Sequence, residues 1–138
     1  MRFTVKDWMV DVVIFVEPDV TVSEALATMR RRFVASVIVN KSKNNPEYGI
    51  VTCTDISDKI IARNQNPSRI KVSQIMSSPV LTVNQDMQLD DCARMMQEKK
   101  FHHLPVVDES GEVIGMISAK DFMVVAEAIG REPGDRFT

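Results

Sequence analysis

Two short patterns in the sequence place a hydroxyl three residues ahead of a carboxylate: Thr52-x-x-Asp55 and Ser118-x-x-Asp121. Each follows a run of strand-forming residues and stands where a helix is expected to begin. A hydroxyl and a carboxylate at this spacing form a capping box, which stabilises a helix start by about 1 kcal/mol. The same turn presents backbone N–H groups that suit a phosphate and a carboxylate that can accept two ribose hydroxyls. The pattern alone favours capping, and ligand binding can coexist with it.

His102 and His103 are the only histidines, and they stand just before the apolar run Leu104–Val107. Because consecutive strand residues point to opposite faces, the pair cannot bind one compact metal ion, and no third Cys or His has a useful spacing. The sequence therefore predicts no zinc site. One histidine in the core and one at the surface is the favoured interpretation. The alternative is that one or both donate hydrogen bonds to a ligand phosphate.

The remaining charged clusters are typical of helix ends. Arg30–Arg32 and Glu98–Lys100 close two predicted helices, where cations complement the helix dipole, so a solvated cluster is favoured over an anion site. Asp90 and Asp91 stand at a helix start, where acidic side chains are expected electrostatically. The sequence contains no G-x-S-x-G, glycine-rich phosphate loop, dinucleotide fingerprint or H-E-x-x-H. No reaction follows from it, and we expect no enzyme activity.

The composition is that of an ordinary globular domain. Of 138 residues 44% are hydrophobic, and 17 Lys and Arg against 19 Asp and Glu give a formal net charge of −2. Without a basic excess, a nucleic-acid partner is not expected. Cys53 and Cys92 lack a paired C-x-x-C spacing, so the sequence predicts that both are buried thiols of a protein in a reducing compartment. The apolar run Val12–Val16 is too short to span a membrane, so we expect a cytoplasmic protein without a membrane partner.

The elements that position these residues occur twice, because the chain repeats itself once, at one offset through the first helix of each half. Val5 and Met9 recur as Val72 and Met76. At the same offset, apolar residues at helical spacing recur as well, and they predict two amphipathic helices with matching buried faces. They are Val22, Ala25, Leu26 and Met29 in the first half and Leu89, Cys92, Ala93 and Met96 in the second.

Beyond these helices the offset is expected to lengthen by one position. It then matches Phe33 with Phe101 and the strand Val37–Asn40 with Pro105–Asp108. A third, shorter offset matches the run Tyr48–Asp55 with Ile114–Asp121, which leads into a closing helix in each half. The slips fall at turns, where insertions are tolerated.

Each half is therefore predicted to run strand, helix, strand, strand, helix, after a lead-in segment at Val5–Met9 or Val72–Met76. The predicted fold class is α/β (α+β), with two pseudo-symmetric β-α-β-β-α repeats as domains 1–66 and 67–138. A lone half of roughly 60 to 70 residues buries only a marginal core. The halves are therefore expected to pack as a pseudo-two-fold pair and to share one core.

Four stretches of the second half resemble the CBS-domain family, named for cystathionine β-synthase. They are Val72–Met76, Pro79–Val83, Phe101–Asp108 and Gly115–Phe122. With their copies in the first half, these motifs cover nearly the whole chain in the order of a tandem CBS pair, or Bateman module. Each motif is short, but their order, spacing and duplication are together specific.

The resemblance implies a regulatory module that binds AMP, ADP, ATP or S-adenosylmethionine in one or two clefts between the repeats and requires no cofactor. In such proteins the aspartate of the [ST]-x-x-D pattern holds the ribose, and basic or hydroxyl groups hold phosphates. Carried onto this sequence, the resemblance assigns Ser118, Lys120 and Asp121 to one cleft and Thr52, Thr54 and Asp55 to the other. The residues implied to face each cleft from the opposite repeat are Phe33, Val34 and Ala35 toward Asp121, and Phe101 and His102 toward Asp55. His102-His103-Leu104 is also similar to the His-Arg-Leu stretch of the γ subunit of the energy-sensing kinase, where the basic side chains reach phosphate.

The first half departs from the family pattern. Val37 stands where the second half has Pro105, and Val34-Ala35 replace His102-His103. We therefore expect unequal clefts, the one at Asp121 being the tighter.

Two function classes remain open. The first is a stand-alone sensor of an adenosine-containing ligand that signals to a separate effector protein, and the paired aspartates favour it. The second is a structural or interaction dimer that binds no nucleotide, and an enzyme is a distant third. We expect a homodimer formed through the closing helices, because the last helix carries more apolar surface than one buried face needs. Its apolar residues are Phe122, Met123, Val125, Ala126 and Ile129.

Overall fold

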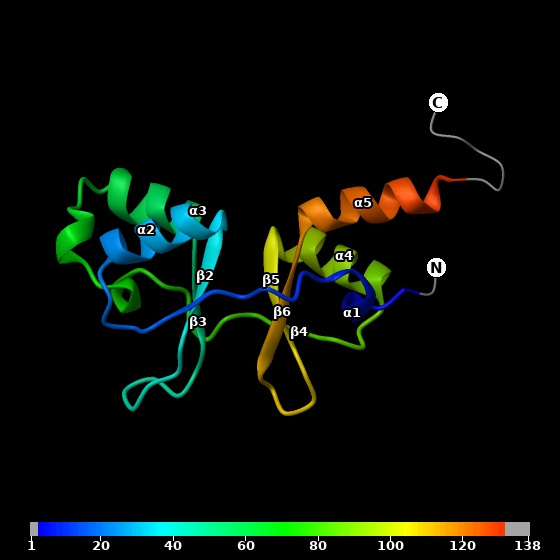
Figure 1. Ribbon diagram of the computed structural model, residues 1–138, viewed down its shortest axis with the longest axis horizontal. Coiled ribbons are helices and arrows are strands. Elements are labelled where there is room, and N and C mark those ends of the chain that lie inside the picture. The colour runs from blue at the N-terminus through cyan, green and yellow to red at the C-terminus, as the bar shows by residue number, and fades with distance from the viewer. Residues whose placement is uncertain (1–2, 132–138) are drawn as a thin grey trace. The chain divides into compact units, whose positions relative to one another are not determined.

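The computed structural model describes residues 3–131, which fold as two compact units (Figure 1). One unit is continuous, Val13–Val80, and the other joins the described residues up to Val12 with those from Leu81 onward. The lead-in segment of each repeat thus packs in the unit that holds the other repeat's sheet. The predicted division into domains 1–66 and 67–138 follows the sequence repeat and stays a prediction. The two compact units have different boundaries, because each lead-in segment belongs to the unit of the other repeat.

The continuous unit contains the sheet and helices of the first repeat. In chain order they are β1 (Phe15–Val16), α2 (Val22–Arg32), β2 (Ser36–Val39), β3 (Gly49–Thr52), α3 (Cys53–Ile56), the π-helical turn η1 (Ser57–Ile61), and the 3-10 turns η2 (Pro67–Arg69) and η3 (Val72–Gln74). β1 is parallel to β2, and β3 is antiparallel to β2. This order matches the predicted strand, helix, strand, strand, helix.

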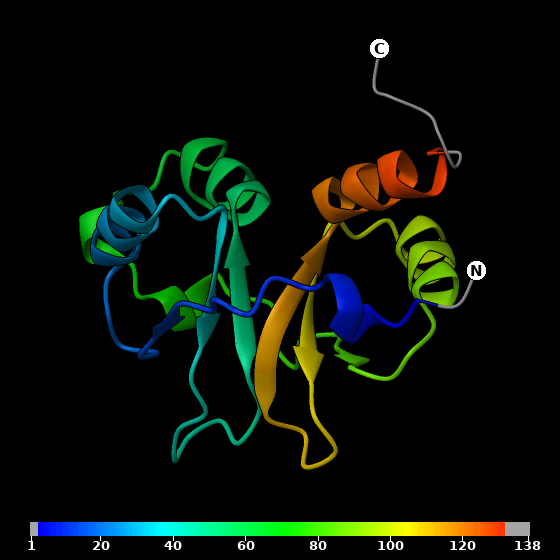
Figure 2. The same ribbon diagram turned by 45° about the vertical axis from the view of Figure 1, so that its right-hand side comes forward.

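The other unit repeats this arrangement. Its elements are α1 (Val5–Trp8), β4 (Val83–Asn84), α4 (Leu89–Lys99), β5 (His103–Val107), β6 (Val113–Ser118) and α5 (Ala119–Ile129). β4 is parallel to β5, and β6 is antiparallel to β5. Figures 1 and 2 show α4 and α5 side by side next to this sheet. The predicted element order and the mixed α/β class are therefore confirmed in both units.

The two amphipathic helices form as their spacing predicts. α2 begins after Thr21, whose hydroxyl accepts a hydrogen bond of 3.1 Å from the backbone N–H of Glu24, and it ends at Phe33 in the left-handed conformation, with φ of 55°. α4 likewise ends at Lys100, with φ of 60°. The buried faces are Val22, Ala25 and Met29 in α2, and Leu89, Cys92 and Met96 in α4.

Most buried apolar residues belong to two clusters, one in each unit. The lead-in segments contribute to both clusters, and a core shared by the two halves stays a prediction. Val5 of α1 is fully buried among the residues of β4, α4, β5 and β6, while Val72 and Ile75 complete the cluster under α2. Each unit therefore receives a buried segment that the sequence repeat assigns to the other.

The strand register corrects the predicted change of offset after the amphipathic helices. β2 begins at Ser36, which lies opposite Thr52 on β3, and β5 begins at His103, which lies opposite Ser118 on β6. Ser36 therefore corresponds to His103, at the same offset that relates Val5 to Val72. A slip of one position would exchange the two faces of a strand, so the difference matters for every side chain on it.

The helix ends explain why the offset does not change. α2 and α4 both have 11 residues, and each is followed by one left-handed residue, so Phe33 corresponds to Lys100 and not to Phe101. The pair that corresponds to His102-His103 is consequently Ala35-Ser36. Matching Phe33 with Phe101 by residue type was misleading because the two residues have different backbone conformations.

Candidate functional site

Both hydroxyl-carboxylate patterns form complete capping boxes. The backbone N–H of Thr52 donates to Asp55 Oδ2 at 2.8 Å, and its hydroxyl lies 3.3 Å from the same oxygen. Ser118 makes the equivalent contacts to Asp121 Oδ2 at 2.8 and 3.2 Å. The capping interpretation is therefore confirmed at both turns. Capping engages one oxygen of each carboxylate, and the two turns differ at the other oxygen.

The second-repeat turn brings several predicted site residues together. His103 lies opposite Ser118 in the β5–β6 ladder, and the backbone N–H of Ala119 donates to the carbonyl of His102 at 3.0 Å. Burial and the neighbouring His102 hold the pKa of His103 below its usual value, although the carboxylate of Asp121 acts in the opposite direction. His103 is consequently a half-buried neutral imidazole near pH 7, and His102 is exposed.

The two carboxylate oxygens of Asp121 differ in their partners. Within residues 3–131 its Oδ1 atom takes part in no hydrogen bond or ion pair, while Oδ2 serves the cap. The side chain is half-buried, and Lys120 beside it is exposed. The turn thus presents one open carboxylate oxygen next to a neutral imidazole and an exposed ammonium group.

The first-repeat turn has a different environment. Asp55 is buried, and its Oδ1 lies 3.0 Å from the ammonium group of Lys59. That ammonium group also donates to the carbonyl oxygen of Ile75 at 2.7 Å. Lys59 was not among the predicted site residues, although its spacing of four residues from Asp55 on a helical segment is a recognisable signal for an ion pair.

Thr54, which was predicted for this turn, and the residues ahead of β2 have different degrees of exposure. Thr54 is exposed on the first turn of α3, and Val34 is half-buried ahead of β2. The Cys53 thiol is directed at the carbonyl oxygen of Ala35, at 3.6 Å. The prediction that Cys53 is buried is wrong, because this first helical residue faces away from the core, whereas Cys92 is buried as predicted.

An open pocket of about 540 Å³ lies between α4 and α5. Its lining is largely apolar, and it consists of Ala93, Met96, Gln97, Lys100, Phe101, His102, Ala119 and Phe122. Phe101 and His102 therefore line this pocket of their own unit. Their implied placement toward Asp55, and that of Phe33, Val34 and Ala35 toward Asp121, stay predictions.

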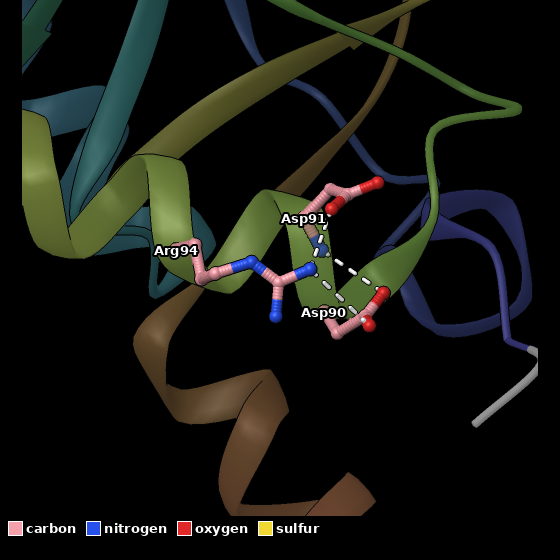
Figure 3. A network of polar contacts seen from close by, with 3 residues as sticks. All are labelled: Asp90, Asp91 and Arg94. Atoms are coloured by element: carbon pink, nitrogen blue, oxygen red, sulfur yellow. Dashed lines mark hydrogen bonds and ion pairs between the residues drawn. The ribbon is translucent and has the colours of Figure 1, made fainter.

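The acidic pair at the start of α4 is an exposed ion-pair network (Figure 3). Arg94 Nη2 lies 2.6 Å from Asp91 Oδ1 and 3.3 Å from Asp90 Oδ2. Exposed pairs of this kind contribute little to stability. Across residues 3–131, no group of three or more His, Cys, Asp or Glu side chains is arranged to hold a metal ion. In the same range, no helix has the length and apolar character needed to cross a membrane.

Two β-α-β-β-α units, each with an aspartate-capped closing helix, define a tandem-repeat α/β protein. The family model that describes the CBS domain matches residues 5–62 and again residues 72–127. These matches span more than half of the chain, so it belongs to the CBS domain family and contains two CBS domains.

Two relatives show how this pair occurs in longer chains. The chain is 34% identical over 108 residues to the uncharacterized protein MK0525 of Methanopyrus kandleri, covering 78% of this chain and 55% of that protein. It is 39% identical over 101 residues to homoserine O-acetyltransferase of Methanococcus vannielii, covering 73% of this chain and 20% of the enzyme. The chain thus spans about half of one relative and a fifth of the other.

Solved structures share the fold over almost the whole chain. The hexameric CBS-CP12 protein from bloom-forming cyanobacteria has a TM-score of 0.85 and 26% identity, covering 99% of this chain and 78% of that one. The CBS domain pair of protein MJ0100, in complex with 5-methylthioadenosine and S-adenosyl-L-methionine, has a TM-score of 0.80 and 22% identity. The second match covers 94% of this chain and 99% of MJ0100's pair, and at this identity it shows the fold alone.

Proposed function

We propose that this CBS pair is a regulatory module that binds an adenosine-containing ligand at the turn 118–121. The observation that supports this most is the state of Asp121. Its Oδ2 atom is held by the cap, which fixes the carboxylate, and its Oδ1 atom has no partner within residues 3–131. A fixed carboxylate with an open oxygen is suited to accept ribose hydroxyls.

Neighbouring groups supply contacts for the rest of such a ligand. Neutral His103 can donate or accept one hydrogen bond, and exposed Lys120 can approach a phosphate or a carboxylate without losing an internal partner. AMP, ADP, ATP and S-adenosylmethionine share the ribose that Asp121 would hold. The fold of the MJ0100 pair, which holds two adenosine compounds, is a precedent for the architecture.

Regulation of another protein, rather than catalysis, is the role we infer for the module. The match to homoserine O-acetyltransferase covers 20% of that enzyme, so most of the enzyme has no counterpart in this match. Ligand binding at the Asp121 turn would then alter the contact with a separate effector protein.

A second candidate function is an interaction module that dimerises and binds no nucleotide. The surface of α5 favours it, since Met123, Val124 and Ile129 are 72%, 56% and 54% exposed. Phe122 and Val125, counted earlier as interface residues, pack instead in or against the core of their own unit. A homodimer through α5 is compatible with both candidates.

Calorimetric titration of the purified protein with AMP, ADP, ATP and S-adenosylmethionine tests the first proposal. Replacing Asp121 by Asn should weaken the binding of the compound that binds best by about tenfold to a hundredfold, since hydrogen bonds to a charged group contribute roughly 1.5 to 3 kcal/mol.

Asp7→Asn is the matched control. Asp7 completes a capping box with Thr4, whose backbone N–H donates to Asp7 Oδ2 at 2.9 Å, but no ligand role is proposed there. Both variants should lose a similar, small amount of stability. If Asp121→Asn behaves like Asp7→Asn and leaves every affinity unchanged, Asp121 is a cap alone and the proposal is wrong.

A further inference from the structure

The closing helices of the two repeats differ by one residue in the spacing between the capping aspartate and the next buried side chain. In α5 the buried residue is Val125, four positions after Asp121. After α3 the chain continues as the π-helical turn η1, and its buried residue is Ile60, five positions after Asp55. A π-turn accommodates one extra residue in a helix, and such turns are often found at functional sites.

Lys59 lies in this π-turn and forms an ion pair with Asp55, four residues before it. The Lys59 side chain is 30% exposed, and its ammonium group bridges Asp55 Oδ1, at 3.0 Å, and the carbonyl oxygen of Ile75, at 2.7 Å. The Asp55 side chain is 11% exposed. With Oδ2 held by the cap, both oxygens of this carboxylate are already engaged inside the unit.

A ribose that binds Asp55 through Oδ1 would compete with the lysine for that oxygen. Replacing the lysine would exchange a contact between two charged groups for hydrogen bonds in which only the carboxylate is charged. It would also separate a half-buried ammonium group from its counter-ion, which is costly in a partly desolvated site. In the second repeat Val125 stands four residues after Asp121, so no such competitor exists on that helix.

We propose that Lys59 is an internal counter-ion that closes the Asp55 turn to adenosine-containing ligands, so that each chain binds one such ligand, at Asp121. The inference depends on the function proposed above, and it identifies Lys59 as the residue that determines which repeat is occupied. The same ammonium group attaches η1 to the segment around Ile75, so the closed turn is also a structural link within the unit.

The number of ligands bound per chain tests this inference. AMP, ADP, ATP and S-adenosylmethionine are each titrated calorimetrically into the wild type, Lys59→Met and Lys71→Met. Lys71 is an exposed lysine of the same unit and controls for the loss of one positive charge. We expect one site per chain in the wild type and in Lys71→Met. Lys59→Met should gain a second site, with an affinity within about tenfold of the first.

Two further variants locate the sites. Asp121→Asn should remove the site of the wild type, and adding Asp55→Asn to Lys59→Met should remove the gained one. Should Lys59→Met fail to fold, Lys59→Gln is used in its place, because its amide can still donate to the carbonyl oxygen of Ile75. Melting curves of every variant show that the folded protein is being titrated.

Failure of the inference can be distinguished from failure of the proposed function. A wild type with one site at Asp121 and a Lys59→Met variant that gains none would overturn the role of Lys59 alone. Two sites in the wild type, one of them lost in Asp55→Asn, would do the same. If no compound binds the wild type but Lys59→Met gains a site at Asp55, the role of Lys59 is supported and the proposed function fails. If nothing binds to any variant, both are wrong.

Discussion

The sulfur atom of Met76 lies 2.5 Å from the position that a Cβ atom on Gly49 would occupy, and Met9 has the same relationship to Gly115, at 2.6 Å. In each unit the methionine comes from the lead-in segment and the glycine from the strand that follows the turn of the hairpin. The pairs are alike in chemistry, but Gly115 also has the carbonyl oxygen of Val10 within 2.8 Å of this position. In each unit the lead-in methionine therefore packs directly against the backbone of a glycine, in the space that a side chain would fill.

Gly115→Ala should destabilise the protein more than Gly49→Ala. At Gly49 a flexible methionine side chain can move aside, whereas at Gly115 the new methyl group also meets the backbone of Val10, which pairs with β6. Overpacking of this kind typically costs about 1–3 kcal/mol. Urea denaturation gives the two free energies of unfolding, and equal losses would contradict the expectation.

Phe33→Asn should stabilise the fold by roughly 1 kcal/mol. Phe33 has φ of 55° and is 95% exposed, so it carries the cost of a left-handed backbone while its ring buries almost nothing. Asparagine tolerates that conformation better. Phe33→Ala is the control, because alanine keeps the unfavourable backbone, and its stability in urea should equal that of the wild type. A loss of stability in both variants would show that the ring has a packing role.

Asp121→Asn should lower the pKa of His103. The carboxylate of Asp121 raises this pKa in the wild type, against the larger effects of burial and of His102, so neutralising it leaves only the lowering effects. NMR titration of the imidazole signals measures the shift, and His102 serves as an internal reference. An unchanged or raised pKa would mean that the two side chains do not sense each other.

Cys92 should make the protein less stable as the pH rises from about 9 to about 11. Burial raises the pKa of its thiol from 9.0 to about 11. Below this range both states keep the proton; within it the unfolded chain releases the proton while the native state retains it, so unfolding becomes easier. Urea denaturation at several pH values should show a smaller decline for Cys92→Ala. A decline as steep as that of the wild type would assign the effect to other groups.

Met123→Glu should convert the expected homodimer into a folded monomer. The Met123 side chain is 72% exposed on α5, and a carboxylate buried at an interface would be strongly unfavourable. Light scattering gives the mass, and Glu109→Lys, in the exposed turn between β5 and β6, is the control that should stay dimeric. A monomeric wild type at micromolar concentration would contradict the prediction.

Local patterns made much of this structure predictable. The capping boxes at Asp55 and Asp121 could be predicted because both partners lie within four residues of each other. The correspondence between β2 and β5 could not be predicted by matching residue types between the repeats, since it depends on the left-handed backbone at Phe33. The spacing of Asp55 and Lys59 signals an ion pair, but the sequence alone does not show that the ammonium group also reaches the carbonyl oxygen of Ile75, which is distant along the chain.

The burial of Val5 has a consequence for the order of synthesis. The continuous unit, Val13–Val80, is complete soon after its last residue has left the ribosome, because all its core residues lie in one stretch. α1 is made before the continuous unit, yet Val5 has no core to enter until β4, α4, β5 and β6 have been translated. Since domains generally fold as units during synthesis, this segment is expected to dock after the continuous unit, which is translated later, has folded.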